Sequence, residues 1–229
     1  MITIKNLTVS YKRNSPVINS LDFSAELNKI HGIVGLNGAG KTTLLNTIYG
    51  LIKADSGEIN FNGNKLKRKE LAYLETENYF YPYITGEEHL NIFRHLSLNR
   101  DIKSWNAVFK LPLEDLIDTY STGMKKKLAI LSIIRQDKQV LILDEPFNGL
   151  DLESVRILRS MLLSLRESRT ILITSHILET LTNLCDTISY LENGKLMFTK
   201  SVGHFSELEK EIYQRIEDKN KEAIERLFQ

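Results

Sequence analysis

One stretch of the sequence combines glycines, a lysine and a threonine at a spacing that suits phosphate binding. Residues Gly35 to Thr42 read GLNGAGKT, which fits the pattern G-x-x-x-x-G-K-[ST]. The glycines let the backbone wrap closely around an anion, so that successive N–H groups point at phosphate oxygens. Lys41 would then reach the β and γ phosphates, and the Thr42 hydroxyl would bind Mg²⁺. The expected nucleotide contacts are Asn37, Gly38, Ala39, Gly40, Lys41, Thr42 and Thr43.

Two adjacent carboxylates follow an apolar run further along the chain. The segment VLILDEP places Asp144 and Glu145 at the end of a strand, which delivers its last side chains to the ligand edge of a parallel sheet. One carboxylate can hold Mg²⁺ through water, and the next can accept a proton from the attacking water or orient it. His176, after the strand TILITS, can donate a hydrogen bond to charge developing on the γ-phosphate. We predict Lys41, Glu145 and His176 as catalytic residues, and Thr42 and Asp144 at the metal.

Hydrophobic periodicity indicates the elements that must position these side chains. Apolar and polar residues alternate from Ile2 to Tyr11, a second strand pattern covers Leu21 to Leu27, and Asn14 to Ser20 between them is expected to be a loop. Further predicted strands include 29–34, 71–75, 139–143 and 170–175, with helices following from near Thr42, Leu152 and Ile177. Strands that alternate with helices imply parallel pairing, whereas the first strands, with no helix between them, predict an antiparallel sheet beside the core.

The whole chain, 1–229, is predicted to be a single α/β domain. Its phosphate-loop NTPase core is mainly a parallel sheet with flanking helices, and together with an N-terminal antiparallel β subdomain it comprises 1–84 and 136–205. Mostly helical periodicity predicts an inserted helical subdomain over 85–135. The charged tail, 206–229, reads most simply as a solvated helix, with a regulatory role as the alternative.

The amino-acid composition indicates which kinds of partner to expect. With 30 basic and 29 acidic residues the formal net charge is +1, so no nucleic-acid partner is expected. The single cysteine, Cys185, excludes an internal disulfide and fits a reducing compartment. No apolar stretch approaches the roughly 18 residues that span a bilayer. Any role at a membrane is therefore expected to require another polypeptide.

The ordered set GLNGAGKTT, YSTGMKKKL, LILDEP, NGLD and TSH resembles the nucleotide-binding cassette of ABC transporters. The resemblance covers roughly Ile2 to Phe198 and implies an ATPase. It implies that Tyr11 stacks on adenine and that the loop from Asn148 to Asp151, with Asp151 at the nucleotide, crosses a dimer interface. It also implies that the signature motif contacts ATP held by the opposite subunit. Here that motif comprises Ser121, Thr122, Gly123 and Met124, with Thr122 and Met124 in place of the family's first glycine and glutamine.

The segment after the strand 71–75 departs from the family pattern. The family has a glutamine where this chain has Thr76, which we place at the metal despite its shorter reach; a shift of one residue in the alignment would substitute a glutamate. The rings of Tyr79, Phe80, Tyr81 and Tyr83 follow. They suggest a groove for a cytoplasmic helix of a membrane partner, with core packing as the alternative. Lys125, Lys126 and Lys127 are expected to form a solvated helix face.

The resemblance implies two cassettes that pair head to tail around MgATP, as a homodimer or heterodimer. They would close on ATP, reopen on hydrolysis and drive a separate transmembrane permease subunit from the cytoplasmic face of the cell membrane. The helical insertion and YSTGM are similar to bacterial drug, antimicrobial-peptide and lipid export cassettes, so export is expected. The alternatives are an importer cassette, a soluble switch acting on ribosomes or DNA, and a cassette that mainly binds ATP.

Overall fold

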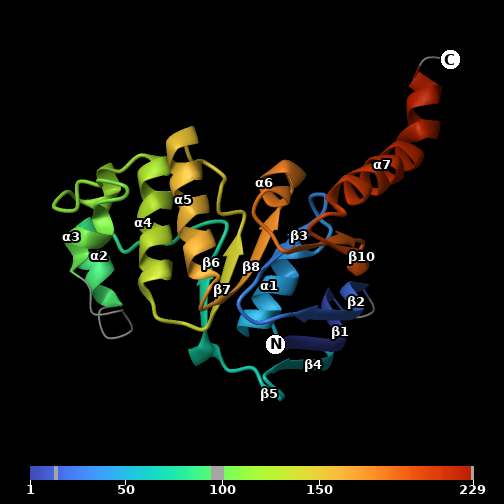
Figure 1. Cartoon of the computed structure of the whole chain (residues 1–229), viewed down its shortest axis with the longest axis horizontal. Helices are drawn as coiled ribbons and strands as arrows, with labels where there is room; N and C mark the ends of the chain where they lie inside the picture. The colour runs from blue at the N-terminus through green and yellow to red at the C-terminus, as the bar shows by residue number, and fades with distance from the viewer. Residues whose placement is uncertain (13–14, 94–100, 228–229) are drawn as a thin grey trace.

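A six-stranded sheet in the order β10-β9-β3-β8-β7-β6 runs through the centre of the molecule (Figure 1). The computed structural model describes residues 1–12, 15–93 and 101–227. The strands are β3 (Ile30–Val34), β6 (Leu71–Leu74), β7 (Val140–Asp144), β8 (Thr170–Ser175), β9 (Thr187–Glu192) and β10 (Lys195–Ser201). From β9 to β6 neighbouring strands pair in parallel, and β10 pairs antiparallel with β9. All residues of β3, β6, β7 and β8 are buried, as expected for a parallel sheet covered on both faces.

A four-stranded antiparallel sheet in the order β2-β1-β4-β5 lies beside this core. Its strands are β1 (Ile2–Lys12), β2 (Ser15–Ala25), β4 (Ser56–Phe61) and β5 (Asn64–Lys65). The predicted loop was wrong for residues 15–20, which belong to β2, whereas Asn14 lies outside the described residues. Because β2 is an edge strand, Pro16 can belong to it although it lacks a backbone N–H. The predicted fold class is confirmed.

Helices cover both faces of the central sheet. The bounds are α1 (Lys41–Tyr49), α2 (Gly86–Ile92), α3 (Ile102–Asn106), α4 (Thr122–Arg135), α5 (Leu152–Leu165), α6 (Leu178–Thr182) and α7 (Phe205–Leu227), with short 3₁₀ turns at Arg68–Glu70 and Ile117–Thr119. Leu44, Leu45 and Ile48 of α1 share one apolar cluster with β1 and β2. A second cluster joins α4, α5 and α6 to the opposite face. Helix α1 is therefore held between the two sheets.

The helices α2, α3 and α4 lie between β6 and β7 in the sequence and to one side of the sheet (Figure 1). This is the segment predicted as a helical subdomain; residues 94–100 of it lie outside the described part. At the other end of the molecule, α7 packs through Phe205, Leu208 and Ile212 and then extends away from the body. Across the described ranges, no helix is long and apolar enough to cross a membrane. The domain boundaries stay a prediction.

The expected solvated face of three lysines was wrong for Lys126, which is only 6% exposed. It precedes Ala129, Ile130 and Ile133 at helical spacing, on the face of α4 that packs into the core. Lys125 and Lys127 are partly exposed. The lysine run therefore crosses from solvent to the interior of the protein.

Helix α5 offers a test of this packing with two adjacent leucines. Leu162 is fully buried and Leu163 is 37% exposed. Replacing Leu162 with alanine leaves a cavity, so we expect the free energy of unfolding to fall by about 2–5 kcal/mol. Leu163→Ala, the matched control, should cost less than about 1 kcal/mol. Chemical denaturation without nucleotide measures both; equal losses would contradict the described orientation of α5.

Candidate nucleotide site

The parallel register brings the ends of three strands to one edge of the central sheet. Val34 of β3 lies opposite Ser175 of β8, and Asp144 of β7 lies opposite Thr174. The glycine loop leaves β3 at this edge and enters α1, whose N-terminus attracts anions. Gly40 has a φ of 107°, and a Cβ there would lie 2.9 Å from Ile18. A side chain at this position would therefore strain the loop and crowd β2.

Lys41 projects from the first turn of α1 back over the loop. Its Nζ donates to the carbonyl oxygens of Gly35, at 2.7 Å, and Leu36, at 3.4 Å. It also lies 3.7 Å from a carboxylate oxygen of Glu145. Burial lowers the pKa of Lys41, and the nearby carboxylates of Glu145 and Asp144 oppose that shift. The loop thus holds one partly compensated positive charge at the place where the sequence predicts phosphate.

The carboxylate of Asp144 is fully buried and is the meeting point of three hydroxyl groups. Its Oδ2 accepts hydrogen bonds from Thr42 and Thr76, both at 2.7 Å, and its Oδ1 accepts one from Thr174. These threonines come from α1, from the loop after β6 and from β8. Thr76 is therefore within reach of Asp144 despite its short side chain, and the three predicted metal-site residues, Thr42, Thr76 and Asp144, lie together.

Glu145 and His176 face each other beside this cluster. Nδ1 of His176 lies 3.0 Å from Oε2 of Glu145, and the backbone N–H of Glu145 donates to the Thr174 hydroxyl at 3.1 Å. The backbone of Glu145 is left-handed, with a φ of 48°. Such a conformation is uncommon for a residue with a side chain and costs energy. The fold therefore imposes this backbone geometry on the buried carboxylate.

One pocket of about 430 Å³ collects most of these side chains. It is lined by Val17, Asn37, Gly38, Gly40, Lys41, Thr42, Thr43, Thr76, Glu145, Asn148 and His176. Ala39 and Asp144 do not line it: Ala39 packs into the apolar cluster shared by α1, β1 and β2, and Asp144 is fully buried. Tyr11 lies at its margin, where its phenol hydroxyl forms a 3.1 Å hydrogen bond with Thr43. Tyr11 as a residue is 62% exposed.

The signature residues do not line this pocket in the described part of the chain. Ser121 accepts a hydrogen bond from the Met124 N–H and caps α4, and Thr122 is exposed. A Cβ on Gly123 would lie 3.2 Å from the carbonyl of Gly149, so this helix end touches the predicted interface loop. The signature motif and that loop are therefore neighbours within one chain.

Asp151, predicted at the nucleotide, is engaged within its own chain. Its carboxylate lies 2.9 Å from the Lys127 ammonium and accepts hydrogen bonds from the backbone N–H and the hydroxyl of Ser154, so Asp151 is the N-cap of α5. The Lys127 hydrogen bond, followed by those from Ser154, holds the pKa of Asp151 well below its usual range. Asp151 therefore ties the interface loop to α4.

Sequence reasoning missed two residues at this site. Thr174 is a polar residue in the largely apolar strand β8, two positions before His176. This polar position near the strand end is the sequence signal that could have identified it. Lys126 donates to the Thr76 carbonyl at 3.5 Å. Burial lowers the pKa of Lys126 to about 8, and the carboxylates of Asp144 and Glu145 oppose that shift. Its spacing from Ile130 and Ile133 on α4 marked it as inward-facing.

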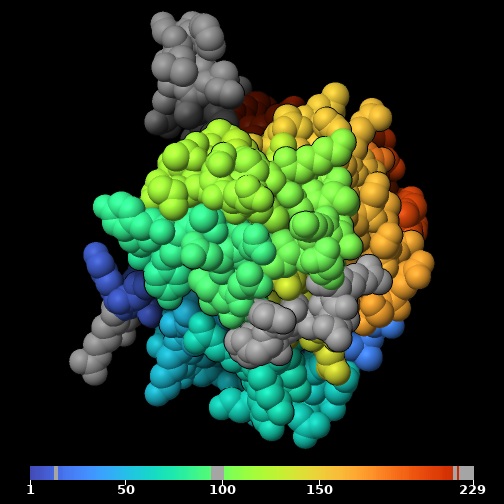
Figure 2. Space-filling model, turned by 90° about the vertical axis from the view of Figure 1, so that its left-hand side faces the viewer, coloured from blue at the N-terminus to red at the C-terminus, as the bar shows by residue number. Residues whose placement is uncertain are grey.

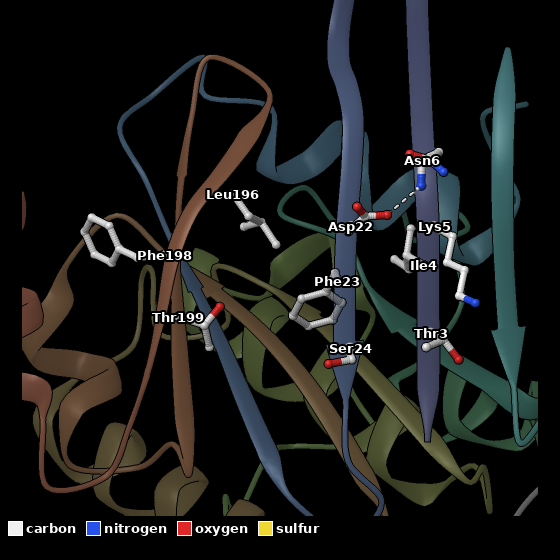
Figure 3. Close-up of a pocket in the computed structure, with 10 residues that line it drawn as sticks. All are labelled: Thr3, Ile4, Lys5, Asn6, Asp22, Phe23, Ser24, Leu196, Phe198 and Thr199. Carbon is white, nitrogen blue, oxygen red and sulfur yellow. Dashed lines mark hydrogen bonds between the residues drawn. The ribbon is translucent and has the colours of Figure 1, made fainter.

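A larger hollow, about 650 Å³, lies between β1, β2 and β10 (Figure 3). It is lined by Thr3, Ile4, Lys5, Asn6, Asp22, Phe23, Ser24, Leu196, Phe198 and Thr199. The one hydrogen bond drawn there runs from the Asn6 N–H to Asp22, at 2.8 Å. None of the residues predicted to bind nucleotide lines this hollow, so it is separate from the site described above.

Comparison with known proteins agrees with the motif set and the fold. The family model described as "ABC transporter" matches residues 18–148, which include the glycine loop, the signature segment and Asp144–Glu145. The chain belongs to the ABC transporter family. As an ABC cassette it is an ATPase and binds ATP.

Relatives of this ABC cassette include proteins of similar length. The lantibiotic transport ATP-binding protein SrtF of Streptococcus pyogenes is 29% identical over 91% of this chain and 94% of its own. A solved ATP-binding subunit of an ABC transporter has a TM-score of 0.82 at 28% identity, over 88% of this chain and 90% of its own. A dimeric ATP-binding cassette bound to ADP and Pi has a TM-score of 0.78 at 19% identity, over 88% and 99%, and shares the fold.

Lys41 supplies a direct test of nucleotide binding by this cassette. At about 100 times Kd, MgATP should stabilise the wild-type protein by roughly 2.7 kcal/mol. Lys41→Ala should remove most of that stabilisation, because a phosphate would lose its main cationic partner. Lys53→Ala, on an exposed lysine after α1, is the control and should keep the full thermal shift. An undiminished shift in Lys41→Ala would show that the phosphates bind elsewhere.

Proposed function

We propose that this ABC cassette hydrolyses MgATP with Glu145 as the base, pairs with a second cassette, and drives export through a separate membrane subunit. The observation that carries the proposal is the convergence of Lys41, Thr42, Glu145 and His176 on one pocket, with Asp144 directly behind it. These groups come from the glycine loop and from the ends of β7 and β8, far apart in the sequence. Such a set can bind phosphate, hold a metal and activate water.

The oxygen atoms around Asp144 fit Mg²⁺. Two hydroxyl groups, from Thr42 and Thr76, lie on one oxygen of a buried carboxylate. Mg²⁺ prefers oxygen ligands and is usually held by one or two carboxylates together with substrate phosphates. When bound, Mg²⁺ would neutralise charge on the phosphate oxygens.

Around that position, each side chain has a distinct task. Lys41 would exchange its contacts with the loop carbonyls for the β and γ phosphates. Glu145 would orient the attacking water and accept its proton. His176, already held 3.0 Å from the Glu145 carboxylate, would donate a hydrogen bond to the charge that develops on the γ-phosphate. Tyr11, at the margin of the pocket, would stack on the adenine ring.

The pairing of two cassettes would complete the site. The signature residues Ser121 to Met124 lie at the N-terminus of α4, away from the pocket lining. The N-terminus of a helix, here capped by Ser121, suits an anion brought by another molecule. We infer that each signature motif meets the ATP of the opposite copy, with the loop from Asn148 to Asp151 at the interface between them.

The surface after β6 suits a protein partner. Tyr79, Tyr81 and Tyr83 are 75%, 57% and 83% exposed, and the rings of Tyr79 and Tyr81 contact edge to face at 5.7 Å. Phe80 instead packs inward against His89 of α2. In the view of Figure 2, the surface of this segment continues into that of the helical insertion. We propose that the exposed tyrosines receive a cytoplasmic helix of the membrane subunit.

The direction of transport rests on analogy with relatives. SrtF is named as a lantibiotic transport protein and matches this chain over nearly the full length of both. We propose that this cassette likewise works on an exporter of peptides or similar amphipathic compounds, from the cytoplasmic face of the membrane.

Glu145→Gln tests the proposed base. The amide cannot accept the proton, so hydrolysis should slow on the order of 10²–10⁴-fold while ATP binding persists. ATP should also trap the closed pair, which size-exclusion chromatography would detect as a dimer. Glu167→Gln, on an exposed carboxylate after α5, serves as control and should turn over normally. A Glu145→Gln variant with wild-type turnover would exclude this base.

A pair of variants tests the tyrosine surface. Tyr79→Ala/Tyr81→Ala should keep the melting temperature and ATP binding, because both rings are exposed. It should lose co-purification with a multi-span membrane protein, since interface aromatics often carry about 2 kcal/mol or more of binding energy. Phe80→Ala should instead lower the melting temperature, because its ring is packed against the core. Normal co-purification of the double variant would rule out this docking surface.

A further inference from the structure

Two lysines of the described chain are buried, and the proposed reaction uses only one of them. Lys41 and Lys126 are 7% and 6% exposed. Lys41 reaches the site from the glycine loop. Lys126 reaches it from α4, which belongs to the helical insertion between β6 and β7. A buried ammonium is costly unless charge and hydrogen bonding compensate it, so its position calls for a physical reason.

The contacts of Lys126 lead to the centre of the site in two steps. Its Nζ donates to the backbone carbonyl of Thr76, at 3.5 Å. The hydroxyl of the same Thr76 donates to Oδ2 of Asp144, at 2.7 Å. Within the described ranges, the Thr76 carbonyl is the hydrogen-bond acceptor that the structure gives to Lys126. The helical insertion is thus connected to Asp144 through a single residue.

The charges around Lys126 compensate its burial in part. The nearby carboxylates of Asp144 and Glu145 both favour its ammonium form. If Lys126 only filled space in the core, it would not need a charge, because well-packed apolar side chains of similar volume often replace buried ions at no loss of stability. The ammonium of Lys126 therefore lies near the same two carboxylates that act on Lys41.

The reach of Thr76 makes its backbone position critical. The threonine hydroxyl lies one bond beyond Cβ, so a small displacement of the backbone would take it off Asp144. Thr76 follows the end of β6 and is itself largely exposed. The Thr76 carbonyl also accepts a hydrogen bond from the Asn78 side chain, at 3.5 Å, but Asn78 belongs to the same loop. The hydrogen bond from Lys126 is therefore the one that ties this carbonyl to a helix.

We propose that Lys126 is a positioning residue for ATP hydrolysis: from α4 it fixes the Thr76 peptide so that the Thr76 hydroxyl stays on the Asp144 carboxylate. The inference rests on the proposed role of Asp144 at the metal. It also makes the helical insertion part of the support of the site, because a movement of α4 would be transmitted to Asp144 through Lys126 and Thr76.

The test begins with Lys126→Met, which keeps an unbranched apolar stem and removes the ammonium. Loss of one hydrogen bond from a charged donor corresponds to a fall in kcat of about tenfold or more. The KM for MgATP and the thermal shift with MgATP should stay at wild-type values, because the phosphate contacts remain. Lys125→Met, one residue away on the same helix and partly exposed, is the matched control and should leave kcat unchanged.

A second background separates positioning from general stability. In Thr76→Gln the longer side chain can reach Asp144 from a less well fixed backbone, so measurable turnover is expected, and the kcat of this single variant is the reference for its background. There, Lys126→Met should cost much less than it does in the wild type, so the two effects should be non-additive. The same fold loss in both backgrounds, or loss of turnover in Thr76→Gln itself, would overturn the proposal.

Melting curves of every variant complete the experiment. If Lys126→Met unfolds, Lys126→Gln replaces it, because its amide keeps a donor on a shorter stem; unfolding of both would assign Lys126 to stability and overturn the inference. Wild-type kcat in folded Lys126→Met, with Glu145→Gln still slow, would overturn this inference and leave the proposed base intact. Normal turnover in Glu145→Gln would instead remove the proposed function.

Discussion

The buried carboxylate of Asp144 is the constraint on which the arrangement of the site depends. An isolated carboxylate could not be buried without its hydrogen bonds, and here three threonine hydroxyls provide them. Each threonine comes from a different element: α1, the loop after β6, and β8. The requirement to satisfy one anion therefore fixes the mutual positions of the glycine loop, the adjoining loop and the strand that leads to His176.

This constraint also explains why the two sheets and the helical insertion all help to position the residues around Asp144. Helix α1 is clamped between the sheets by Leu44, Leu45 and Ile48, so the Thr42 hydroxyl is held by the packing of both. On the other side, α4 packs beside β6 and brings Lys126 to the loop that carries Thr76. The apolar clusters position the elements, and the hydrogen bonds then select the final geometry.

Sequence patterns predicted most of the fold and most of the site, because both depend on periodicity and on strand ends. Apolar runs predicted β7 and β8, and the glycine spacing predicted the loop before Lys41. Residues 15–20 were missed because Pro16 signals a loop, and only the edge position of β2 makes it acceptable in a strand. Lys126 was missed because a run of lysines signals solvent, whereas its burial depends on which face of α4 meets the core. The hydrogen bonds among Thr42, Thr76 and Thr174 depend on distances between strands that no local pattern encodes.

The left-handed backbone of Glu145 lowers the stability of the protein at a position that the proposed activity requires. A residue with a side chain in that conformation costs about 1–3 kcal/mol, and glycine or asparagine would adopt it more readily. Under the proposed role, however, neither glycine nor asparagine could accept a proton from water as the Glu145 carboxylate would. A laboratory selection for heat resistance alone would thus favour replacements at residue 145 that relax the turn and silence hydrolysis. An engineer who wants a more robust cassette should hold this residue fixed and seek stability elsewhere in the chain.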